Sequence, residues 1–365
     1  MSLKCGIIGL TNIGKTTLFN CMSKTRAQSS NFAFSTNKSN MGMCDVPDTR
    51  LFELDKLIKA EKVVPALVEL VDIPGLAKGA SQGEGIGNSF LADIRQTDAL
   101  IHVLRCFDDE NLAHIEGSIN PVRDKEIVEL ELQIKDLDQV EKKMQRVERA
   151  AKTGDKDAKK MIEVLQQYID LFENFGNARN IDLSEDDKKC VADLMLLTDK
   201  PVVYVCNVDA DSAINGNAYT EKFIESVKNE NAEVLIIAGQ MEAEIAELES
   251  MEDREVFLQD MGLTEPGVNK LIRSSYRLLN LIAFFTIGGK ENRAWTIHKG
   301  VNAQVAAGTI HSDLERGFIR AEVIKYSDFI QYKTEAACRD AGKYRLEGKQ
   351  YIVEDGDILH IRFNV

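Results

Sequence analysis

Eight consecutive residues, Gly9 to Thr16, fit the phosphate-binding pattern G-x-x-x-x-G-K-[ST] without a mismatch. An apolar stretch at 5–8 precedes them and predicts a strand, and the residues at 17–22 predict the first turns of a helix. A glycine-rich turn lets backbone N–H groups surround phosphate oxygens, and the start of a helix adds positive potential. In this role Lys15 reaches the β- and γ-phosphates and the Thr16 hydroxyl holds Mg²⁺. Further nucleotide contacts are expected from Asn12, Ile13, Gly14 and Thr17.

A second part of the site is expected after the apolar strand pattern at 66–71, where the chain reads Asp72-Ile73-Pro74-Gly75. Asp72 is expected to hold Mg²⁺ through water, and Gly75 to offer its N–H to the γ-phosphate because no side chain blocks the approach. Thr36, in a polar and aromatic segment, is expected to meet Mg²⁺ or the γ-phosphate only in the triphosphate state. The simpler alternative for Thr36 is that it caps a turn.

Hydrolysis needs a group that orients the attacking water. Ras-type GTPases place a glutamine for this purpose directly after the glycine of the second motif, where this chain has Leu76. A leucine cannot orient water, so hydrolysis is very slow or another group positions the water. His114 lies in an acidic loop after the strand pattern at 99–107, and on the sequence alone a solvated or capping histidine is the simpler interpretation.

The base of the nucleotide is expected at two further strand ends. The strand pattern at 201–206 leads into Asn207-Val208-Asp209-Ala210, at the place where guanine-binding enzymes carry N-K-x-D. The carboxylate of that motif accepts hydrogen bonds from guanine, and Ala210 has no acceptor, so the sequence favours ATP over GTP. Whether Asp211, one residue further on, substitutes for it is left open. The strand pattern at 233–238 should complete the base pocket, and the contacts expected there come from Asn207, Val208, Ala238, Gly239 and Gln240.

These motifs follow successive strands that alternate with helices, which predicts a doubly wound, mostly parallel α/β sheet with its nucleotide domain at 1–120 and 200–280. The residues at 121–199 show apolar positions every three or four residues among charged ones, which predicts an inserted helical hairpin with coiled-coil spacing. This periodicity does not separate a structural spacer from a partner-binding arm. Short strand patterns at 281–365, among them one at 351–353, predict a small α+β domain without a catalytic constellation.

Composition limits the class of protein. With 365 residues, of which 44% are hydrophobic, the chain can form two or three domains that each bury a core. The seven cysteines are scattered and no C-x-x-C pair occurs, so no disulfide framework or zinc site is indicated. We expect a cytoplasmic protein without an export signal or membrane span. A net charge of −14 argues against a general nucleic-acid coat.

The motifs together carry a resemblance to a known family. Gly9 to Thr17, Asp72 to Leu76, Gly83 to Asn88, the helical insertion and the block Glu315 to Ile324 resemble the YchF or Obg-like ATPase family over the whole chain. The resemblance implies a P-loop ATPase of the translation-factor class with a C-terminal ubiquitin-like TGS domain, linked to ribosomes. It also implies that a hydrophobic residue replaces the catalytic glutamine and that His114 is catalytic.

The chain departs from the family pattern at the base motif and in the phosphate loop. Ala210 stands where the family typically has glutamate, and Thr11 and Thr16 stand where proline and serine are usual. Thr16 keeps the hydroxyl that Mg²⁺ requires. Asn12 lies where related potassium-dependent enzymes use an asparagine to coordinate the ion, so K⁺ is expected to stimulate hydrolysis.

Two functions remain in competition at this stage. The first is a slow ATPase whose affinity for ribosomes changes with its nucleotide, and the second is an adaptor that the nucleotide only stabilises. A GTPase that prefers GTP to ATP is a variant of the first function. A phosphotransferase acting on a small molecule is disfavoured, because no acceptor pocket or basic lid cluster is evident.

Overall fold

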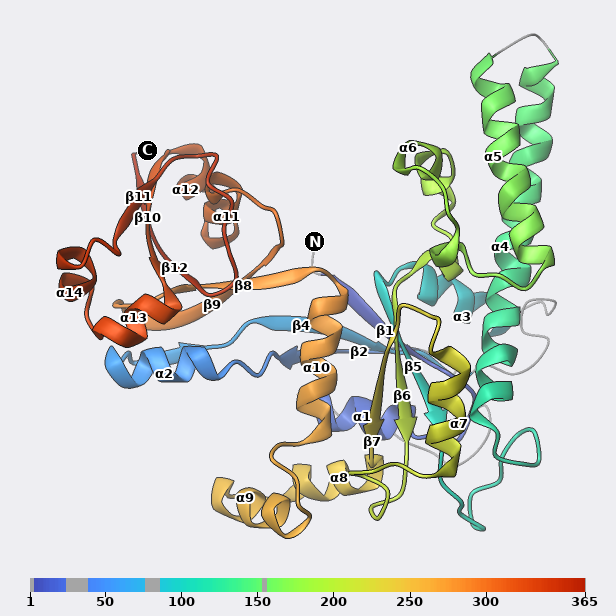
Figure 1. The fold of residues 1–365 in the computed structure, drawn as a ribbon, viewed down its shortest axis with the longest axis horizontal. Helices are drawn as coiled ribbons and strands as arrows, with labels where there is room; N and C mark the ends of the chain where they lie inside the picture. Colours follow the sequence, from blue (N-terminus) through green and yellow to red (C-terminus); the bar gives the residue numbers. More distant parts are fainter. Residues whose placement is uncertain (1–2, 24–38, 76–85, 153–155, 365) are drawn as a thin grey trace. The chain divides into compact units, whose positions relative to one another are not determined.

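The computed structural model describes residues 3–23, 39–75, 86–152 and 156–364. It divides the chain into two compact units, and neither is continuous in sequence (Figure 1). The first unit comprises Met1–Gly42 and Glu69–Leu271, and the second comprises Met43–Val68 and Ile272–Val365. Among the described helices, none combines the length and the apolar composition that crossing a membrane demands.

The first unit is built on a six-stranded sheet with the strand order β2-β4-β1-β5-β6-β7. β1 lies between β4 and β5 and pairs in parallel with both, and β6 is parallel to β5 and to β7. Every residue of β5 and β6 is buried, as expected for parallel strands covered on both faces. The carboxyl ends of β1, β4, β5, β6 and β7 therefore lie along one edge of the sheet. The strands are β1 Lys4–Ile8, β2 Asn40–Asp45, β4 Leu67–Asp72, β5 Ala99–Arg105, β6 Val202–Asn207 and β7 Glu233–Ile237.

The predicted doubly wound sheet is confirmed, but the sequence interpretation contained no strand at β2. That segment reads Asn-Met-Gly-Met-Cys-Asp, which lacks the β-branched residues typical of strands. Its inward positions are Gly42 and Cys44, and they alternate with exposed methionines. The helices of this unit are α1 Lys15–Met22, α3 Ile86–Arg95, α7 Ala218–Val227, α8 Gly239–Glu247 and α9 Met251–Asp260, and α10 Gly267–Leu278 continues into the second unit.

The expected helical hairpin is formed by α4 (Pro121–Ala151) and α5 (Lys156–Glu173), which lie side by side in Figure 1. Short helices then lead back to the sheet: η1 Ala178–Asn180, α6 Glu185–Lys188, η2 Lys189–Leu194 and η3 Leu197–Asp199. The buried residues between the helices are those that a period of three to four selects. They are Val140, Met144, Val164, Leu165, Tyr168 and Phe172, with Ala178, Val191 and Leu196 from the returning segment.

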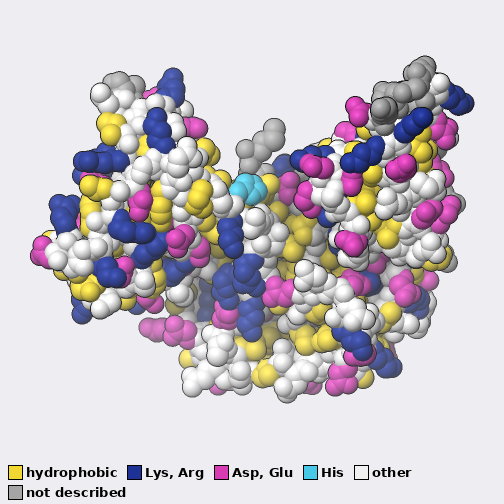
Figure 2. All heavy atoms as spheres, turned by 45° about the horizontal axis from the view of Figure 1, so that its top comes forward, with side chains coloured by type: hydrophobic (Ala, Val, Ile, Leu, Met, Phe, Trp, Pro, Cys, Tyr) yellow, Lys and Arg dark blue, Asp and Glu magenta, His cyan; other side chains and the backbone are white. Residues whose placement is uncertain are grey.

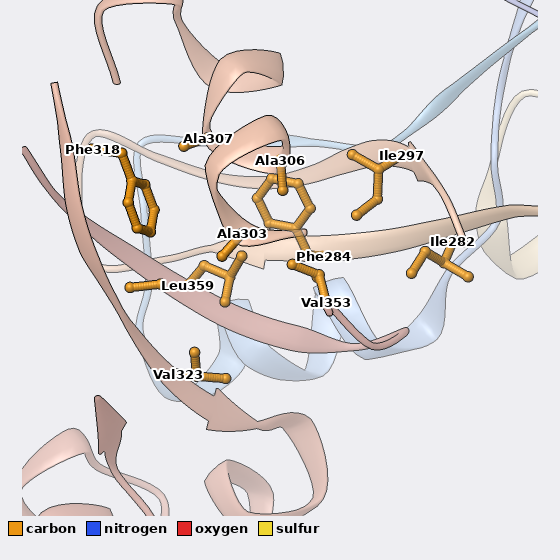
Figure 3. Close-up of a cluster of buried hydrophobic side chains, with 11 residues drawn as sticks. Ile282, Phe284, Ile297, Ala303, Ala306, Ala307, Phe318, Val323, Val353 and Leu359 are labelled. Atoms are coloured by element: carbon orange, nitrogen blue, oxygen red, sulfur yellow. The ribbon is translucent and has the colours of Figure 1, made fainter. Parts of the chain in front are cut away.

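The second unit contains a mixed six-stranded sheet with the order β11-β10-β12-β8-β9-β3. The hairpin β8–β9 and the pair β10–β12 are antiparallel, whereas β12 and β8 are parallel. Helix α11 lies on this sheet through three alanines, whose small side chains permit close approach to Phe284 and Leu359 (Figure 3). The strands are β3 Lys62–Val64, β8 Leu281–Thr286, β9 Glu291–His298, β10 Phe318–Lys325, β11 Arg345–Glu347 and β12 Asp357–Phe363. The helices are α2 Thr49–Leu57, α11 Ala303–Ile310, α12 Ser312–Arg316, α13 Tyr326–Tyr332 and α14 Glu335–Asp340.

Two features of this unit differ from the sequence prediction. The expected domain boundaries assigned all of 1–120 to the nucleotide domain, yet α2 and β3 belong to the second unit, where β3 pairs in parallel with β9. Such a pairing between segments more than two hundred residues apart leaves no local signal in the sequence. The strand expected at 351–353 is reduced to a single bridge between Asn302 and Ile352, and the added strand lies at Arg345–Glu347 instead.

Candidate nucleotide site

The turn between β1 and α1 has the backbone of a phosphate-binding loop. Gly14 adopts φ 93° in the left-handed region and forms the N-terminal cap of α1, and no side chain caps this helix. A Cβ atom on Gly14 would lie 2.3 Å from Asn207 Nδ2, so both the dihedral angle and the space require glycine. The uncapped first N–H groups of a helix are the donors that bind phosphate oxygens in other proteins.

Lys15 is buried, with 6% of its surface exposed, and its ammonium group is held by the loop. Nζ donates hydrogen bonds to the carbonyl oxygens of Gly9 at 3.2 Å and Leu10 at 2.5 Å. Burial lowers the pKa of Lys15 to about 8, and the negative charge of Asp72 acts in the opposite direction. An anionic phosphate next to this group would therefore favour its charged form.

Thr16 and Asp72 meet beside Lys15, where the Thr16 hydroxyl donates a hydrogen bond to Asp72 Oδ2 over 2.8 Å. The other oxygen, Oδ1, is buried and has no hydrogen-bond partner within the described part of the chain. Burial raises the pKa of Asp72, while Lys15, Thr16 and Asn40 favour its charged form. An unsatisfied carboxylate oxygen next to a hydroxyl fits Mg²⁺, which prefers hard oxygen ligands. No cluster of three or more potential metal-binding side chains exists among the described residues, so phosphate and water must complete such a coordination shell.

Gly75 brings the turn after β4 directly onto the phosphate loop. A Cβ atom at this position would lie 2.6 Å from Thr11 Cγ2 and 2.8 Å from Thr11 Cα. Real Cβ atoms do not approach other atoms so closely, so any larger residue would push the two loops apart. The predicted partners Lys15, Thr16, Asp72 and Gly75 are thus brought together at the ends of β1 and β4.

Asn207 links the phosphate loop to the loop after β7. Its side chain is buried, Nδ2 donates to the Ile13 carbonyl oxygen at 2.9 Å, and Oδ1 accepts from the Gly239 N–H at 2.9 Å. Both ends of the amide therefore fix loops that the sequence assigned to the nucleotide. Val208 is buried and donates its N–H to the Ile237 carbonyl oxygen at 3.0 Å, and Ala238 is the N-terminal cap of α8.

The fourth position of the base motif carries no carboxylate. Ala210 is exposed in a turn that Asp209 stabilises, since Asp209 Oδ1 accepts the N–H of Ser212 at 2.9 Å. Asp211 and Gln240 are also exposed. Among the described residues, Asp211 is accessible to solvent and takes no part in the two hydrogen bonds by which Asn207 joins its loops.

The side chain of His114 is buried rather than solvated, and it contacts the first turn of α4. Its Nε2 lies 2.8 Å from Asp124 Oδ2, and the exposed fractions of the two side chains are 5% and 2%. Its Nδ1 accepts the N–H of Glu116 at 3.1 Å. Because Nδ1 is an acceptor, the proton lies on Nε2 and is donated to Asp124.

Arg105, at the end of β5, is a site residue that the sequence interpretation did not single out. Its side chain is fully buried, and the guanidinium group donates to the carbonyl oxygens of Phe107, Leu112 and Asp109 at 3.1, 2.7 and 3.2 Å. It thereby shapes the loop that leads to His114. Asn12 of the phosphate loop meets the end of this loop, because its Nδ2 donates to the Ala113 carbonyl oxygen at 3.4 Å. The one available sequence signal was an arginine within an otherwise apolar strand pattern.

Of the residues that the sequence interpretation used, Thr36, Leu76, Gly83 and Gly85 lie outside the described part of the chain. Thr17 lies in the first turn of α1 and is half-buried.

Comparisons with known proteins agree on the family. The family model described as "50S ribosome-binding GTPase" matches residues 4–165, and the YchF-GTPase_C model, described as "Protein of unknown function (DUF933)", matches residues 281–364. The chain is 49% identical to the ribosome-binding ATPase YchF of Pasteurella multocida over the full length of both, and 47% identical to that of Bacillus subtilis, again over both full lengths. The structure of the Schizosaccharomyces pombe YchF GTPase superposes with a TM-score of 0.86 at 35% identity, covering 99% of this chain and 98% of that one.

Proposed function

The chain belongs to the YchF family, and from this premise we propose that it is a ribosome-binding ATPase that hydrolyses ATP slowly to ADP and phosphate. The observation that carries the hydrolase assignment is the convergence of Lys15, Thr16, Asp72 and Gly75 at the ends of two neighbouring strands. No acceptor other than water is suggested by the described residues around this convergence. Ribosome binding is supported by the names of the curated relatives.

We propose the preference for ATP separately, because the names of the similar proteins disagree about the nucleotide. The curated relatives are named ATPases, whereas the matching family model and the similar solved structure are named GTPases. We favour ATP because Ala210 offers no acceptor to the N–H groups of guanine, and a buried donor without a partner costs about 1–3 kcal/mol. Asp211 is the residue that would have to move to restore guanine recognition.

In the proposed mechanism the chain's own residues bind and orient the nucleotide. The N–H groups at the start of α1 and the ammonium group of Lys15 bind the phosphate oxygens, and Gly75 fixes the second motif against Thr11. Thr16 and Asp72 would hold Mg²⁺, which would supply positive charge where negative charge develops on the phosphates. We assign Thr36 to the same metal and γ-phosphate, and His114 to the orientation of the attacking water. A K⁺ ion near Asn12 is part of this proposal.

The distribution of charge supports a contact between the C-terminal domain and ribosomal RNA. Residues 281–365 contain 12 Lys and Arg against 11 Asp and Glu, which is a net charge of +1. Since the whole chain has a net charge of −14, the other 280 residues have a net charge of −15. On the face shown in Figure 2, Lys and Arg side chains are prominent over the second unit, whereas basic and acidic side chains are mixed on the hairpin α4–α5. RNA phosphates are therefore repelled least by the C-terminal domain.

The test of this function measures binding and turnover with both nucleotides. Calorimetry with ATP and GTP should show that ATP binds at least as tightly, and phosphate release should be abolished in Lys15→Ala and Asp72→Ala. Normal turnover in either variant would contradict the site, and a clear GTP preference would contradict the assignment to ATP. Co-sedimentation with ribosomes in ATP, ADP and no nucleotide then separates a switch from an adaptor, since equal affinities in all three leave nothing to switch. Equal rates in Na⁺ and K⁺ at matched ionic strength would remove K⁺ from the proposal.

A further inference from the structure

Both ring nitrogens of His114 are used by the protein itself. Nδ1 accepts a backbone N–H from Glu116, and the Nε2 proton is directed to Asp124 over 2.8 Å. An imidazole orients an attacking water only with a nitrogen that is free and within hydrogen-bond reach of that water. Since both ring nitrogens have protein partners and 5% of the side chain is exposed, His114 offers no free nitrogen to such a water in this conformation.

The partner of His114 is also held in place. Asp124 is 2% exposed, and its other oxygen, Oδ1, accepts hydrogen bonds from Arg123 at 2.8 and 3.1 Å. The same arginine donates to the hydroxyl of Ser118 at 2.9 Å. The carboxylate therefore has a fixed position, and the buried, charge-assisted bond to His114 is of the stronger kind.

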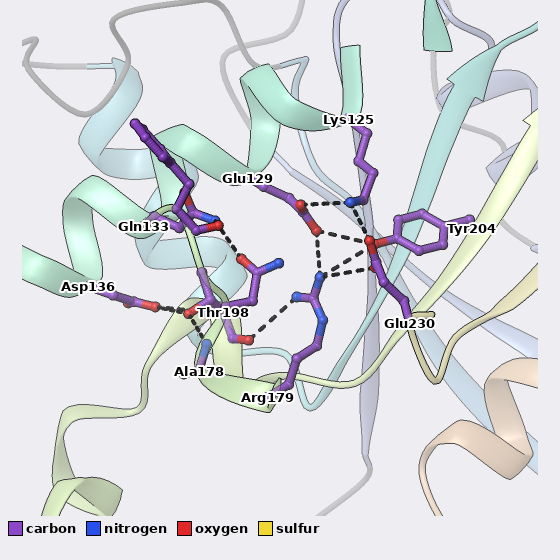
Figure 4. Close-up of polar contacts among 11 residues, drawn as sticks. Lys125, Glu129, Gln133, Asp136, Ala178, Arg179, Thr198, Tyr204 and Glu230 are labelled. Carbon is purple, nitrogen blue, oxygen red and sulfur yellow. Dashed lines mark hydrogen bonds and ion pairs between the residues drawn. The ribbon is translucent and has the colours of Figure 1, made fainter. Parts of the chain in front are cut away.

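Asp124 lies in the first turn of α4, the first of the two helices of the hairpin α4–α5. Further along the same helix, Glu129 contacts Lys125, Arg179 and Tyr204, and this cluster joins α4 to β6 (Figure 4). Asp136 then accepts hydrogen bonds from Leu197 and Thr198 at 2.8 Å. Because a helix moves as a stiff element, a displacement of α4 that also shifts these contacts carries Asp124 with it.

We propose that the bond between His114 and Asp124 is a latch, which keeps the histidine away from the nucleotide. A partner bound to the hairpin α4–α5 releases the histidine by moving the first turn of α4. The proposal rests on the function proposed above, with the ribosome as the partner. Asp124 is then a positioning residue that represses turnover in the free protein. A histidine held by aspartate for catalysis, as in a hydrolase triad, would need one free nitrogen, which this one lacks.

The first experiment compares phosphate release by Asp124→Asn, Asp124→Ala and Asp124→Ala/His114→Ala, all without ribosomes. Glu126→Gln is the matched control, because it removes an exposed carboxylate from the same part of α4 without touching His114. We expect turnover to rise roughly tenfold in Asp124→Ala and less in Asp124→Asn, which keeps an acceptor oxygen without its charge. The double variant should lose this gain, and the control should match the wild type. Lower or unchanged turnover in both Asp124 variants, or a fast double variant, overturns the latch.

The second experiment needs no turnover. The chain has five histidines, so a slowly exchanging Nε2–H proton of His114 can be assigned by nitrogen-15 NMR through its loss in His114→Ala. The signal should be present in the free wild type and in Glu126→Gln, and absent in Asp124→Ala. A free wild type without the signal, or an Asp124→Ala variant that keeps it, overturns the latch. A wild type that neither binds nor hydrolyses ATP refutes the proposed function instead, and the two failures are thereby distinguished.

Discussion

Single residues at the nucleotide site act by joining loops to one another. Asn207 connects the phosphate loop with the loop after β7, and Gly75 connects the turn after β4 with Thr11. Arg105 satisfies three carbonyl oxygens of the loop that ends at Ala113. A substitution at any of these positions is therefore expected to change the spacing of several nucleotide-binding segments together.

Gly75→Ala should reduce both MgATP affinity and turnover, each by at least about tenfold. The added Cβ atom would meet Thr11 at 2.6–2.9 Å, so the turn that carries Asp72 must move away from the phosphate loop. Calorimetry and phosphate release measure the two effects. Gly289→Ala is the matched control, since a Cβ atom there meets nothing within 4 Å. Wild-type affinity in Gly75→Ala would show that the two loops separate without consequence.

At the scale of elements, the part of α4 from Lys125 to Asp136 is fixed to the rest of the first unit by buried polar groups and not by apolar contacts alone. In Figure 4, Glu129 from α4 faces Arg179 and Tyr204, and Lys125 approaches Glu230. Asp136 holds the beginning of η3 through the N–H groups of Leu197 and Thr198. The outer part of the hairpin is packed by the apolar stripe instead, so the two parts of α4 can be tested separately.

The anchor at Asp136 predicts a specific dependence of stability on pH. Burial raises the pKa of Asp136 to about 6 from 3.8, against the hydrogen bonds from Leu197 and Thr198. Between these two values the folded protein binds more protons than the unfolded chain, so stability falls as pH rises from about 4 to 6. Relative to Asp136→Asn, the wild type should lose up to about 3 kcal/mol over this range and nothing further above pH 7. Urea unfolding of both proteins at several pH values measures the difference, and a constant difference would contradict the shifted pKa.

Removal of the outer hairpin should separate ribosome binding from ATP binding. Deleting 146–162 and joining the ends with a short glycine linker keeps Asp124, Glu129 and Asp136, whereas a cut nearer the sheet would remove buried partners. We expect unchanged ATP affinity by calorimetry and at least fivefold weaker co-sedimentation with ribosomes. If co-sedimentation stays at the wild-type level, the outer hairpin is a spacer and the C-terminal domain remains as the candidate surface.

At the scale of the whole molecule, the segment Met43–Val68 connects the two units in sequence while folding with the second. Asn292 donates to Asp55 at 2.8 Å, and Arg50 pairs with Asp48 and Asp355, each at 2.8 Å. The chain enters this segment within β2, which follows Thr36 in sequence, and leaves it within β4, which ends at Asp72. Both motifs expected to sense the γ-phosphate are therefore joined covalently, through one strand each, to the C-terminal unit.

Arg50→Met should weaken the dependence of ribosome affinity on the nucleotide. The change removes both ion pairs of Arg50 and its contact over the Phe285 ring, and so loosens α2 within the second unit. We expect the ratio of ribosome affinities in ATP and ADP to fall towards one, with ATP turnover within about twofold of wild type. Arg316→Met is the control, because its side chain is 73% exposed and pairs with Asp313 alone among the described contacts. An unchanged ratio would show that nucleotide state does not reach the C-terminal unit through this segment.

The sequence by itself determined the parts of the site that are contiguous in the chain. Gly9 to Thr16 and Asp72 to Gly75 encode their geometry locally, because glycine conformations, a helix start and a strand end depend on neighbouring residues. The helical hairpin was predictable for the same reason, since its period is a local property. Tertiary structure alone decided that Asn207 joins two loops, that Met43–Val68 folds with the C-terminal unit, and that His114 is bound to Asp124. Each of these depends on which surfaces meet after the chain has folded, and no pattern within either partner specifies such a meeting.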